Sequence, residues 1–159
     1  MRHLLFLLIF VVLLNPIHAA EIIVDNDSAG TEATGIWQPS SGKNTYGTQS
    51  LYSREIGATY RFTLSIPEPG LYDVNLWWTE FFNRSTNVAI DVVHRDGTET
   101  IFVNQKQNGG QWNNIGSWYF ATDAVVIIHS NSTSKSTGAD AVQLISIPDD
   151  LPPDDLEII

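Results

Sequence analysis

From Glu21 onward, apolar residues alternate with polar ones in short runs, and turn-forming residues separate these runs. A period of two is typical of strands that bury one face, and no stretch keeps the period of an amphipathic helix. The pattern therefore predicts an all-β domain. Strands are expected over nine segments: 22–25, 50–53, 58–65, 71–78, 87–94, 98–104, 115–120, 124–129 and 139–145.

The clearest local signal is a hairpin centred on Asp96 and Gly97. These two residues lie between two runs rich in β-forming side chains, and they favour the positive φ angles of a tight turn. The flanking strands should then be antiparallel neighbours. Alternation places five of their side chains in the core, namely Val88, Ile90, Val92, Ile101 and Val103.

About nine antiparallel strands at regular spacing favour a two-sheet β-sandwich of the jelly-roll type, because a single open sheet of that size would expose long edges. A closed barrel is the alternative. Residues 29–49 show little alternation and are rich in Gly, Ser and Thr, so we expect a long surface loop across one end of the sandwich.

The first twenty residues have the layout of a secretory signal peptide. Arg2 and His3 precede an apolar run at 4–14, and the small residues Ala19 and Ala20 follow. This run is shorter than the roughly 20 apolar residues that a spanning helix needs. Cleavage near Ala19 or Ala20 would give a secreted or periplasmic chain without a stable membrane span. An uncleaved N-terminal anchor is the alternative.

The rest of the chain divides into one domain and a tail. Residues 21–147 suffice for a single domain with its own core. Proline and acidic residues recur in the segment 148–159, PDDLPPDDLEII, and such a composition does not form a packed core. We expect this segment to be an acidic, proline-rich tail or linker.

Charge and composition narrow the range of partners. The chain has 18 acidic and 8 basic residues, a formal net charge of −10 at pH 7, and no cysteine. Such a surface repels nucleic acid and anionic lipid. It also argues against strongly anionic polymers as ligands, unless a local basic patch overrides the average. Without cysteine, neither disulfides nor thiolate chemistry can contribute.

The sequence carries no recognisable catalytic motif. G-x-S-x-G, H-E-x-x-H, a phosphate-binding loop and a cysteine nucleophile are all absent. Glycoside hydrolysis would need two carboxylates across a sugar bond, and no pair of acidic residues stands out by spacing. We therefore predict a non-catalytic protein, and a polysaccharide hydrolase or lyase is the least favoured alternative.

Trp77 is the aromatic residue that alternation singles out for binding. It falls on the strand face of Asp73 and Asn75, opposite the core-facing Trp78. An exposed indole beside polar side chains suits a sugar ring, which stacks on the indole while its hydroxyls are hydrogen-bonded. Packing of Trp77 under a loop is the alternative.

The stretch 103–114 is a second candidate, because it is dense in amides and contains Gln105, Gln111 and Trp112. Amide groups donate and accept hydrogen bonds at once, so they match sugar hydroxyls well. The alternative is a solvated loop in which Trp112 serves as a hydrophobic plug.

One metal site is a candidate. Asp25 and Asp27 follow the first predicted strand, and with a distant carboxylate such as Asp140 they offer oxygen ligands to Ca²⁺. The segment lacks the spacing of a helix-loop-helix calcium site, and a simple Asx turn is the alternative. No other cofactor is expected.

Five segments resemble, in order, the golvesin C-terminal-like domain, which is also described as the carbohydrate-binding-domain-like part of xanthan lyases. They are VDNDSAG (24–30), LYDVNLWW (71–78), NRST (83–86), VVHRDGTETIFVNQKQNGGQWNNIGSWYF (92–120) and ADAVQL (139–144). The positions that match the family pattern are Trp78, Asn83, Arg84, Thr86, His94, Asn104, Gln105, Gly109, Gly110, Gln111, Trp112 and Asp140.

The resemblance implies a jelly-roll sandwich similar to galactose-binding domains, usually attached to bacterial extracellular enzymes, that binds polysaccharide or cell-surface glycan. Asn83, Arg84, Gln105 and Trp112 are then either ligand contacts or a buried polar network that fixes the loops. Trp77 falls where the family pattern varies. A structural or protein-interaction domain of the cell envelope, with a protein partner, is the alternative function.

Overall fold

The computed structural model describes residues 19–148, and all regular secondary structure in this range is β. The predicted signal peptide at 1–20 and the predicted tail at 148–159 fall almost entirely outside the described residues. The strands are β1 (Glu21–Asp25), β2 (Thr31–Thr34), β3 (Gln38–Pro39), β4 (Leu51–Ser53), β5 (Thr59–Leu64), β6 (Gly70–Trp77), β7 (Val88–His94), β8 (Gly97–Val103), β9 (Asn113–Phe120), β10 (Ala124–His129), β11 (Thr137–Ala139) and β12 (Ala141–Ile147).

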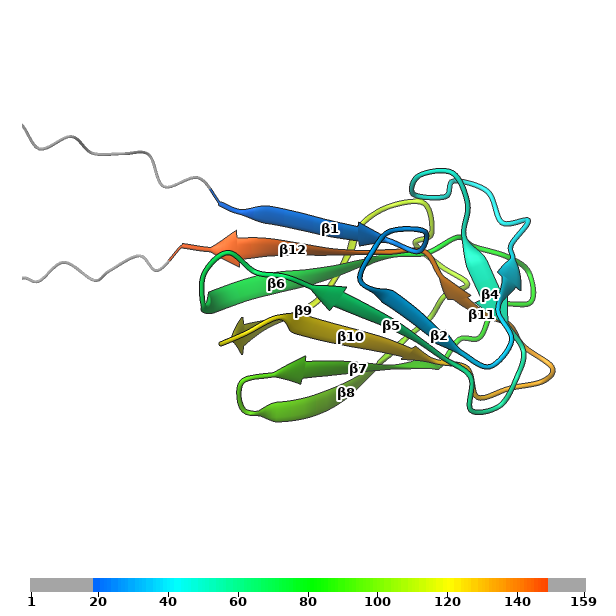
Figure 1. The fold of residues 1–159 in the computed structure, drawn as a ribbon. Coiled ribbons are helices and arrows are strands. Elements are labelled where there is room, and N and C mark those ends of the chain that lie inside the picture. Colours follow the sequence, from blue (N-terminus) through cyan, green and yellow to red (C-terminus); the bar gives the residue numbers. More distant parts are fainter. Residues whose placement is uncertain (1–18, 149–159) are drawn as a thin grey trace, which may run out of the picture.

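Two antiparallel sheets form the body of the molecule (Figure 1). One has four strands in the order β1-β12-β6-β9, and the other has five in the order β2-β5-β10-β7-β8. The first and last described strands, β1 and β12, are hydrogen-bonded neighbours, with Val24 opposite Val142. The described chain therefore enters and leaves the sandwich at the same end (Figure 1). This is the predicted jelly-roll sandwich.

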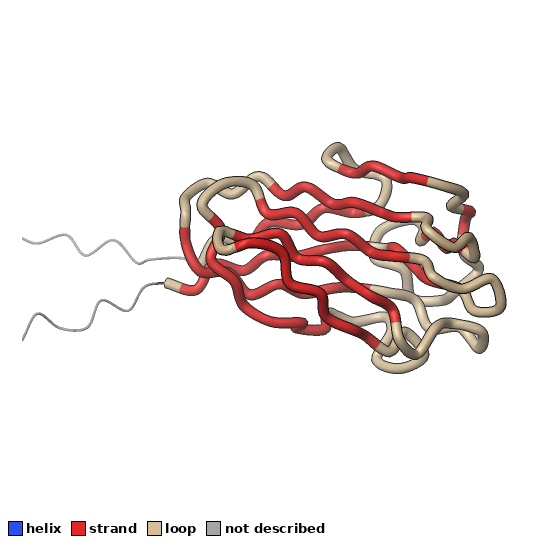
Figure 2. The backbone as a smooth tube through the Cα atoms, turned by 90° about the horizontal axis from the view of Figure 1, so that it is seen from below, coloured by secondary structure: helices blue, strands red, loops and turns tan. Residues whose placement is uncertain are grey.

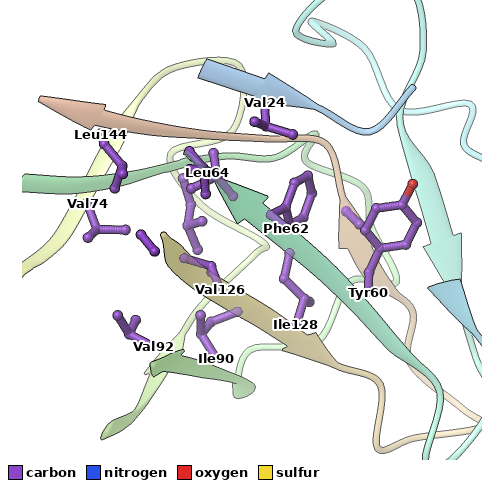
Figure 3. Packing of buried hydrophobic residues seen from close by; sticks show 14 of the residues in the cluster. Val24, Tyr60, Phe62, Leu64, Val74, Ile90, Val92, Val126, Ile128 and Leu144 are labelled. Atoms are coloured by element: carbon purple, nitrogen blue, oxygen red, sulfur yellow. The ribbon is translucent and has the colours of Figure 1, made fainter. Parts of the chain in front are cut away.

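The core lies between the two sheets, where alternate residues of each strand meet (Figure 3). Val74 and Leu144 of the four-stranded sheet face Phe62, Ile90 and Val126 of the five-stranded sheet. All five side chains are 0% exposed. Burial of these apolar side chains is the main source of stability in a chain that has no disulfide to assist it.

The predicted pairing of the two hairpin strands is confirmed, but the turn lies at Arg95 and Asp96, one residue earlier than the predicted Asp96 and Gly97. Strands β7 and β8 pair in antiparallel register on either side of the turn at Asp96, with Ile90 opposite Ile101. Gly97 has a φ of +135°, a backbone angle that residues with a Cβ rarely adopt. The five side chains assigned to the core are buried in it or packed against it, namely Val88, Ile90, Val92, Ile101 and Val103.

The prediction of a continuous loop over 29–49 is wrong, because β2 and β3 lie within that segment. Three of the four residues of β2 are exposed, since it is an edge strand with little of its surface against the core. It therefore has no apolar alternation to reveal it. β3 has only two residues, one of them Pro39, and is too short to carry a pattern.

The last predicted strand, 139–145, is divided in the structure. The chain leaves β11, which belongs to a small third sheet, and enters β12 of the four-stranded sheet. The break falls at Asp140, whose side chain is only 1% exposed. Asp140 thus separates two strands and buries its carboxylate. The alternation of apolar and polar residues does not predict such a break.

The third sheet lies at the end of the sandwich opposite the termini, in the order β11-β4-β3. The longer loops gather at this same end (Figure 2). We call it the loop end. Within residues 19–148 there is no apolar helix of membrane-spanning length.

Replacement of the core residue Phe62 tests the packing. Phe62 is 0% exposed, whereas Phe102 is 60% exposed on the edge strand β8. Phe62→Ala should lower the free energy of unfolding by about 3 to 5 kcal/mol, because it removes buried contacts and leaves a cavity. Phe102→Ala should change it by about 0.5 kcal/mol or less. Urea unfolding followed by tryptophan fluorescence measures both, and equal effects would contradict this assignment of the core.

Candidate functional site

Four adjoining hollows cross the loop end, and we call them together the loop-end groove. The first has a volume of about 480 Å³. It shares Tyr52 and Arg54 with a second, smaller hollow of about 80 Å³. The second shares Ser41 and Phe81 with a third of about 300 Å³, and the third shares Glu80 and Phe81 with a fourth of about 540 Å³. Volumes of a few hundred Å³ are typical of small-ligand sites.

Tyr52 and Arg54 separate the first two hollows. The Tyr52 hydroxyl donates to Oε1 of Gln38 at 2.9 Å, which fixes the ring across β3 and β4. The Arg54 guanidinium carbon lies 5.9 Å from the centre of that ring, within the range of a cation–π contact. Ile36 and Ile56 line the same hollow and are 63% and 66% exposed. The first hollow thus combines apolar surface, an aromatic ring and polar groups.

Arg84 lies beneath the second hollow and is 1% exposed. Its Nε donates to the Thr79 carbonyl at 3.0 Å, and its Nη2 donates to Ser40 Oγ at 2.8 Å. Its Nη1 donates to Ser136 Oγ at 3.1 Å. Thr79 follows β6, Ser40 follows β3 and Ser136 precedes β11. The side chain of Arg84 therefore connects three segments of the loop end. Burial lowers the pKa of Arg84 to about 10, which still leaves it cationic at neutral pH.

Of the residues predicted for ligand binding, Asn83 and Arg84 line the groove. Asn83 Oδ1 accepts a hydrogen bond from the Ser136 hydroxyl at 2.9 Å. Gln105 does not line it and is 1% exposed. Its side-chain amide forms two hydrogen bonds with the backbone of Gly138, at 2.9 and 2.7 Å. Gln105 therefore fastens the 103–114 segment to β11.

Trp77 and Trp112 come together, with a distance of 5.4 Å between ring centres and an edge-to-face arrangement. Tyr46 completes an aromatic trio, 5.7 Å from Trp77 and 5.0 Å from Trp112. The Trp77 indole donates to the Asn44 carbonyl at 2.8 Å. Asn44 lines the third hollow, but neither tryptophan lines any of the four. The trio therefore borders the groove and supports its floor at Asn44.

Asp73, Asn75 and Gln111 complete the predicted ligand set, and the structure does not bring them to the groove. Asp73 Oδ1 accepts from the Ser117 hydroxyl on the neighbouring strand β9. Asn75 is 7% exposed and donates to Gln143 Oε1 at 3.1 Å. Gln111 is exposed beside Trp112. The outward face of β6 is thus occupied largely by cross-strand contacts.

A separate set of oxygen atoms gathers around Asp140. Its Oδ2 accepts from the Tyr46 backbone N–H at 3.4 Å, whereas its Oδ1 is buried without a partner among the described residues. Oδ1 of Asn26 is also buried without a hydrogen-bond partner among the described residues. Burial, together with the smaller effect of the charge of Asp25, raises the pKa of Asp140 to about 8. Burial also raises the pKa of Asp25.

Asp27 differs from the other two predicted calcium ligands. It is exposed, and its Oδ2 accepts from the Thr48 hydroxyl at 3.2 Å. The described residues contain no group of three or more His, Cys, Asp or Glu side chains arranged to hold a metal. Any cation here would have to draw on the carboxylates of Asp25 and Asp140 together with amide and backbone oxygens, which are ligands that Ca²⁺ accepts.

A comparison with family models decides the classification of this sandwich. The golvesin C-terminal domain matches residues 22–146, which is nearly the whole described region. The chain belongs to the golvesin C-terminal domain family. Within this golvesin-type domain, the match extends from β1 to β12 and includes every segment that forms the loop-end groove.

Relatives of this golvesin-type domain include far larger proteins. A xanthan lyase of Bacillus sp. (strain GL1) is 35% identical over 136 residues, which cover 79% of this chain but 15% of that protein. The solved Paenibacillus xanthan lyase matches with 36% identity and a TM-score of 0.75, over 80% of this chain and 13% of that one. A family 35 carbohydrate binding module from Clostridium thermocellum shares the fold, with a TM-score of 0.61, 11% identity, and coverage of 81% and 100%.

Sequence reasoning missed Tyr52, Arg54 and their neighbours in the first hollow. They lie on and after β4, a strand of only three residues. The one available signal was composition, since an aromatic residue, a cation and a carboxylate follow one another closely from Tyr52 to Glu55. Such a run does not distinguish a binding surface from an ordinary solvated turn.

The pKa of Asp140 predicts a pH dependence of stability in chelator-treated protein. In the folded chain the pKa is about 8, against 3.8 for the ordinary carboxyl, so folding favours the protonated acid. The stability that protonation gives is present below pH 4 and is lost as the pH rises through 8. The free energy of unfolding should therefore fall by a few kcal/mol between pH 5 and pH 8.

Urea unfolding at several pH values measures this loss against Asp140→Asn as the matched variant. Asparagine cannot ionise, so the variant should show a flatter pH profile over the same range. A wild-type profile as flat as that of Asp140→Asn would contradict the raised pKa.

Proposed function

We propose that the chain is a secreted, non-catalytic carbohydrate-binding module that holds polysaccharide or cell-surface glycan in the loop-end groove. Secretion is proposed from the signal-like layout of residues 1–20. Binding is proposed from the groove itself and from the relatives. Both xanthan lyases contain a region similar to this chain, and proteins that share its fold include family 35 carbohydrate binding modules.

The observation that carries the proposal is the composition of the first hollow. A sugar ring has an apolar face and a rim of hydroxyls, so its site needs a flat apolar surface beside groups that donate and accept hydrogen bonds. Tyr52 and the exposed Ile36 and Ile56 offer the apolar surface. Gln38 and Arg54 offer the polar groups. The open row of hollows suits a chain-like ligand that extends beyond one sugar.

The carboxylates of the groove support a non-catalytic role. Glycosidases place two carboxyl groups on either side of one glycosidic bond. Glu55 lines the first hollow, and Glu80 lines the third and fourth. Each accepts a hydrogen bond from a backbone N–H, of Ile36 at 2.7 Å and of Gly109 at 2.9 Å. These acids hold loops in place, and they do not share a hollow.

Affinity electrophoresis in gels that contain glucan, galactan, xylan, mannan or carboxylated polysaccharides tests the proposal. The protein should be retarded by at least one polymer. Tyr52→Ala should weaken that interaction by about 1 kcal/mol or more, because it removes the aromatic surface of the first hollow. Tyr119→Ala is the matched control, since Tyr119 also carries an arginine over its ring, Arg95 at 4.2 Å, outside the groove.

The same gels decide between the groove and the tryptophan site predicted from the sequence. Loss of binding in Trp77→Ala and Trp112→Ala, with Tyr52→Ala unaffected, would move the site to the aromatic trio. No retardation by any polymer of the panel would refute glycan binding altogether.

We also propose that Asp25, Asn26 and Asp140 contribute to a structural Ca²⁺ site. A cation among them would provide a partner for the two buried oxygens that have none, Oδ1 of Asn26 and Oδ1 of Asp140. It would also offset the repulsion between the carboxylates of Asp25 and Asp140. Asp27, which is exposed and bonded to Thr48, would lie outside the first ligand set.

Thermal unfolding of chelator-treated protein at pH 8, with and without added Ca²⁺, tests this site. Ca²⁺ should raise the Tm of wild type, because a ligand that binds only the folded state stabilises it. Asp140→Asn should abolish most of that increase, and Asp27→Asn should retain it. An unchanged Tm of wild type in millimolar Ca²⁺ would rule the site out.

A further inference from the structure

We propose that the loop-end groove selects glycans that carry carboxylate groups, such as polymers of uronic acids. This inference rests on the proposed function, since it names the ligand class of the same groove. It runs against the overall charge of the chain, which is −10.

Basic residues concentrate in the groove. Lys43, Arg54, Arg84 and Lys106 line it, which is four of the 8 lysines and arginines in the chain. Of the 13 acidic residues within 19–148, two line it, Glu55 and Glu80. A local excess of cations in a hollow attracts anionic ligands even when the whole molecule is acidic.

The two kinds of charge also differ in their contacts. Both carboxylates of the groove accept backbone N–H groups, which reduces their capacity to bind a ligand. The side chains of Lys43, Arg54 and Lys106 form no hydrogen bond or ion pair within the described residues, where the only ion pairs are Arg95–Asp96 and His129–Asp91. The charges of the three exposed cations are therefore available to a ligand, although Arg54 also lies over the Tyr52 ring, while each carboxylate has one oxygen engaged.

Arg84 adds a permanent positive charge below the second hollow. No carboxylate of the described region lies within 4.0 Å of its nitrogens. Neutral oxygens of Ser40, Thr79 and Ser136 accept its hydrogen bonds instead. In a site of low dielectric constant, a charge without a close counterion acts more strongly on a nearby ligand than the same charge in water.

The distribution of these cations over adjoining hollows suits a charged polymer. Arg54 adjoins the first and second hollows, Lys43 lines the third, and Lys106 lines the fourth. Each end of the groove also carries apolar surface, from Ile36 at one end and Phe82, 78% exposed, at the other. Successive acidic sugars could thus place a ring on apolar surface and a carboxylate beside a cation.

The experiment uses matched ligand pairs on the full chain. Oligosaccharides from polygalacturonate, alginate and hyaluronan are titrated in parallel with the carboxyl-reduced oligosaccharides made from each. At least one acidic oligosaccharide should bind about tenfold or more tightly than its reduced form, since hydrogen bonds to charged groups contribute more than neutral ones. Its affinity should also fall as the salt concentration rises.

Charge-removing substitutions locate the effect. Arg54→Gln should weaken binding of the acidic oligosaccharide about tenfold and leave binding of the reduced form nearly unchanged. Lys43→Gln and Lys106→Gln should act in the same direction. Arg95→Gln is the matched control, because Arg95 is an exposed arginine stacked on a tyrosine, but on the opposite part of the surface from the groove residues. It should leave both affinities unchanged.

The possible results separate this inference from the function on which it rests. Equal binding of acidic and reduced forms, or binding of neutral glycans alone, would overturn the selectivity and leave glycan binding intact. An equal loss of affinity in Arg95→Gln and Arg54→Gln would also overturn it, since the effect would then reflect overall charge. Failure to bind any glycan would refute both.

Discussion

A buried guanidinium must have its N–H groups paired with acceptors, because a charge and five donors removed from water are costly when left unpaired. At Arg84 this requirement joins three segments of the loop end. Its acceptors are Ser40, Thr79 and Ser136, which belong to segments far apart in the chain. Ser40 and Ser136 line the second hollow, so the shape of that part of the groove depends on the contacts of Arg84. Gln105 acts in a similar way when it binds both backbone groups of Gly138.

The body of the sandwich needs no such device, and for that reason the sequence predicts it well. Strands such as β5 and β7 bury every second residue between the sheets, so their period is visible in the chain. β2 is an exposed edge strand and β3 has two residues, and neither leaves a pattern to read. The strand break at Asp140 was not predicted for a related reason, because the residues on both sides of it, 137–139 and 141–144, are all buried and show no alternation that could mark the break.

The candidate site was only partly accessible to sequence reasoning. Family resemblance pointed to Asn83 and Arg84, and these two line the groove. Tyr52 and Arg54 could not be found, because the groove joins segments whose proximity is set by the third sheet and by Arg84. Alternation placed Trp77 on the outward face of β6, yet it could not show that Tyr46 and Trp112 would pack against the indole. Local periodicity predicts which face of the sheet a residue lies on. It does not predict which residues of a distant loop will pack against that face.

The two proposed sites are coupled through charge. Asp140 is the acid whose charge acts most on Arg84 and raises its pKa against the effect of burial. Asp140 has a raised pKa itself, so at neutral pH it is largely protonated and offers Arg84 little compensation. Ca²⁺ bound to an ionised Asp140 would offset its negative charge. The net charge near Arg84 would then be no more negative than when Asp140 is protonated. In either state the guanidinium has no ionised carboxylate within 4.0 Å among residues 19–148, and this uncompensated charge is what the proposed preference for acidic glycans would use.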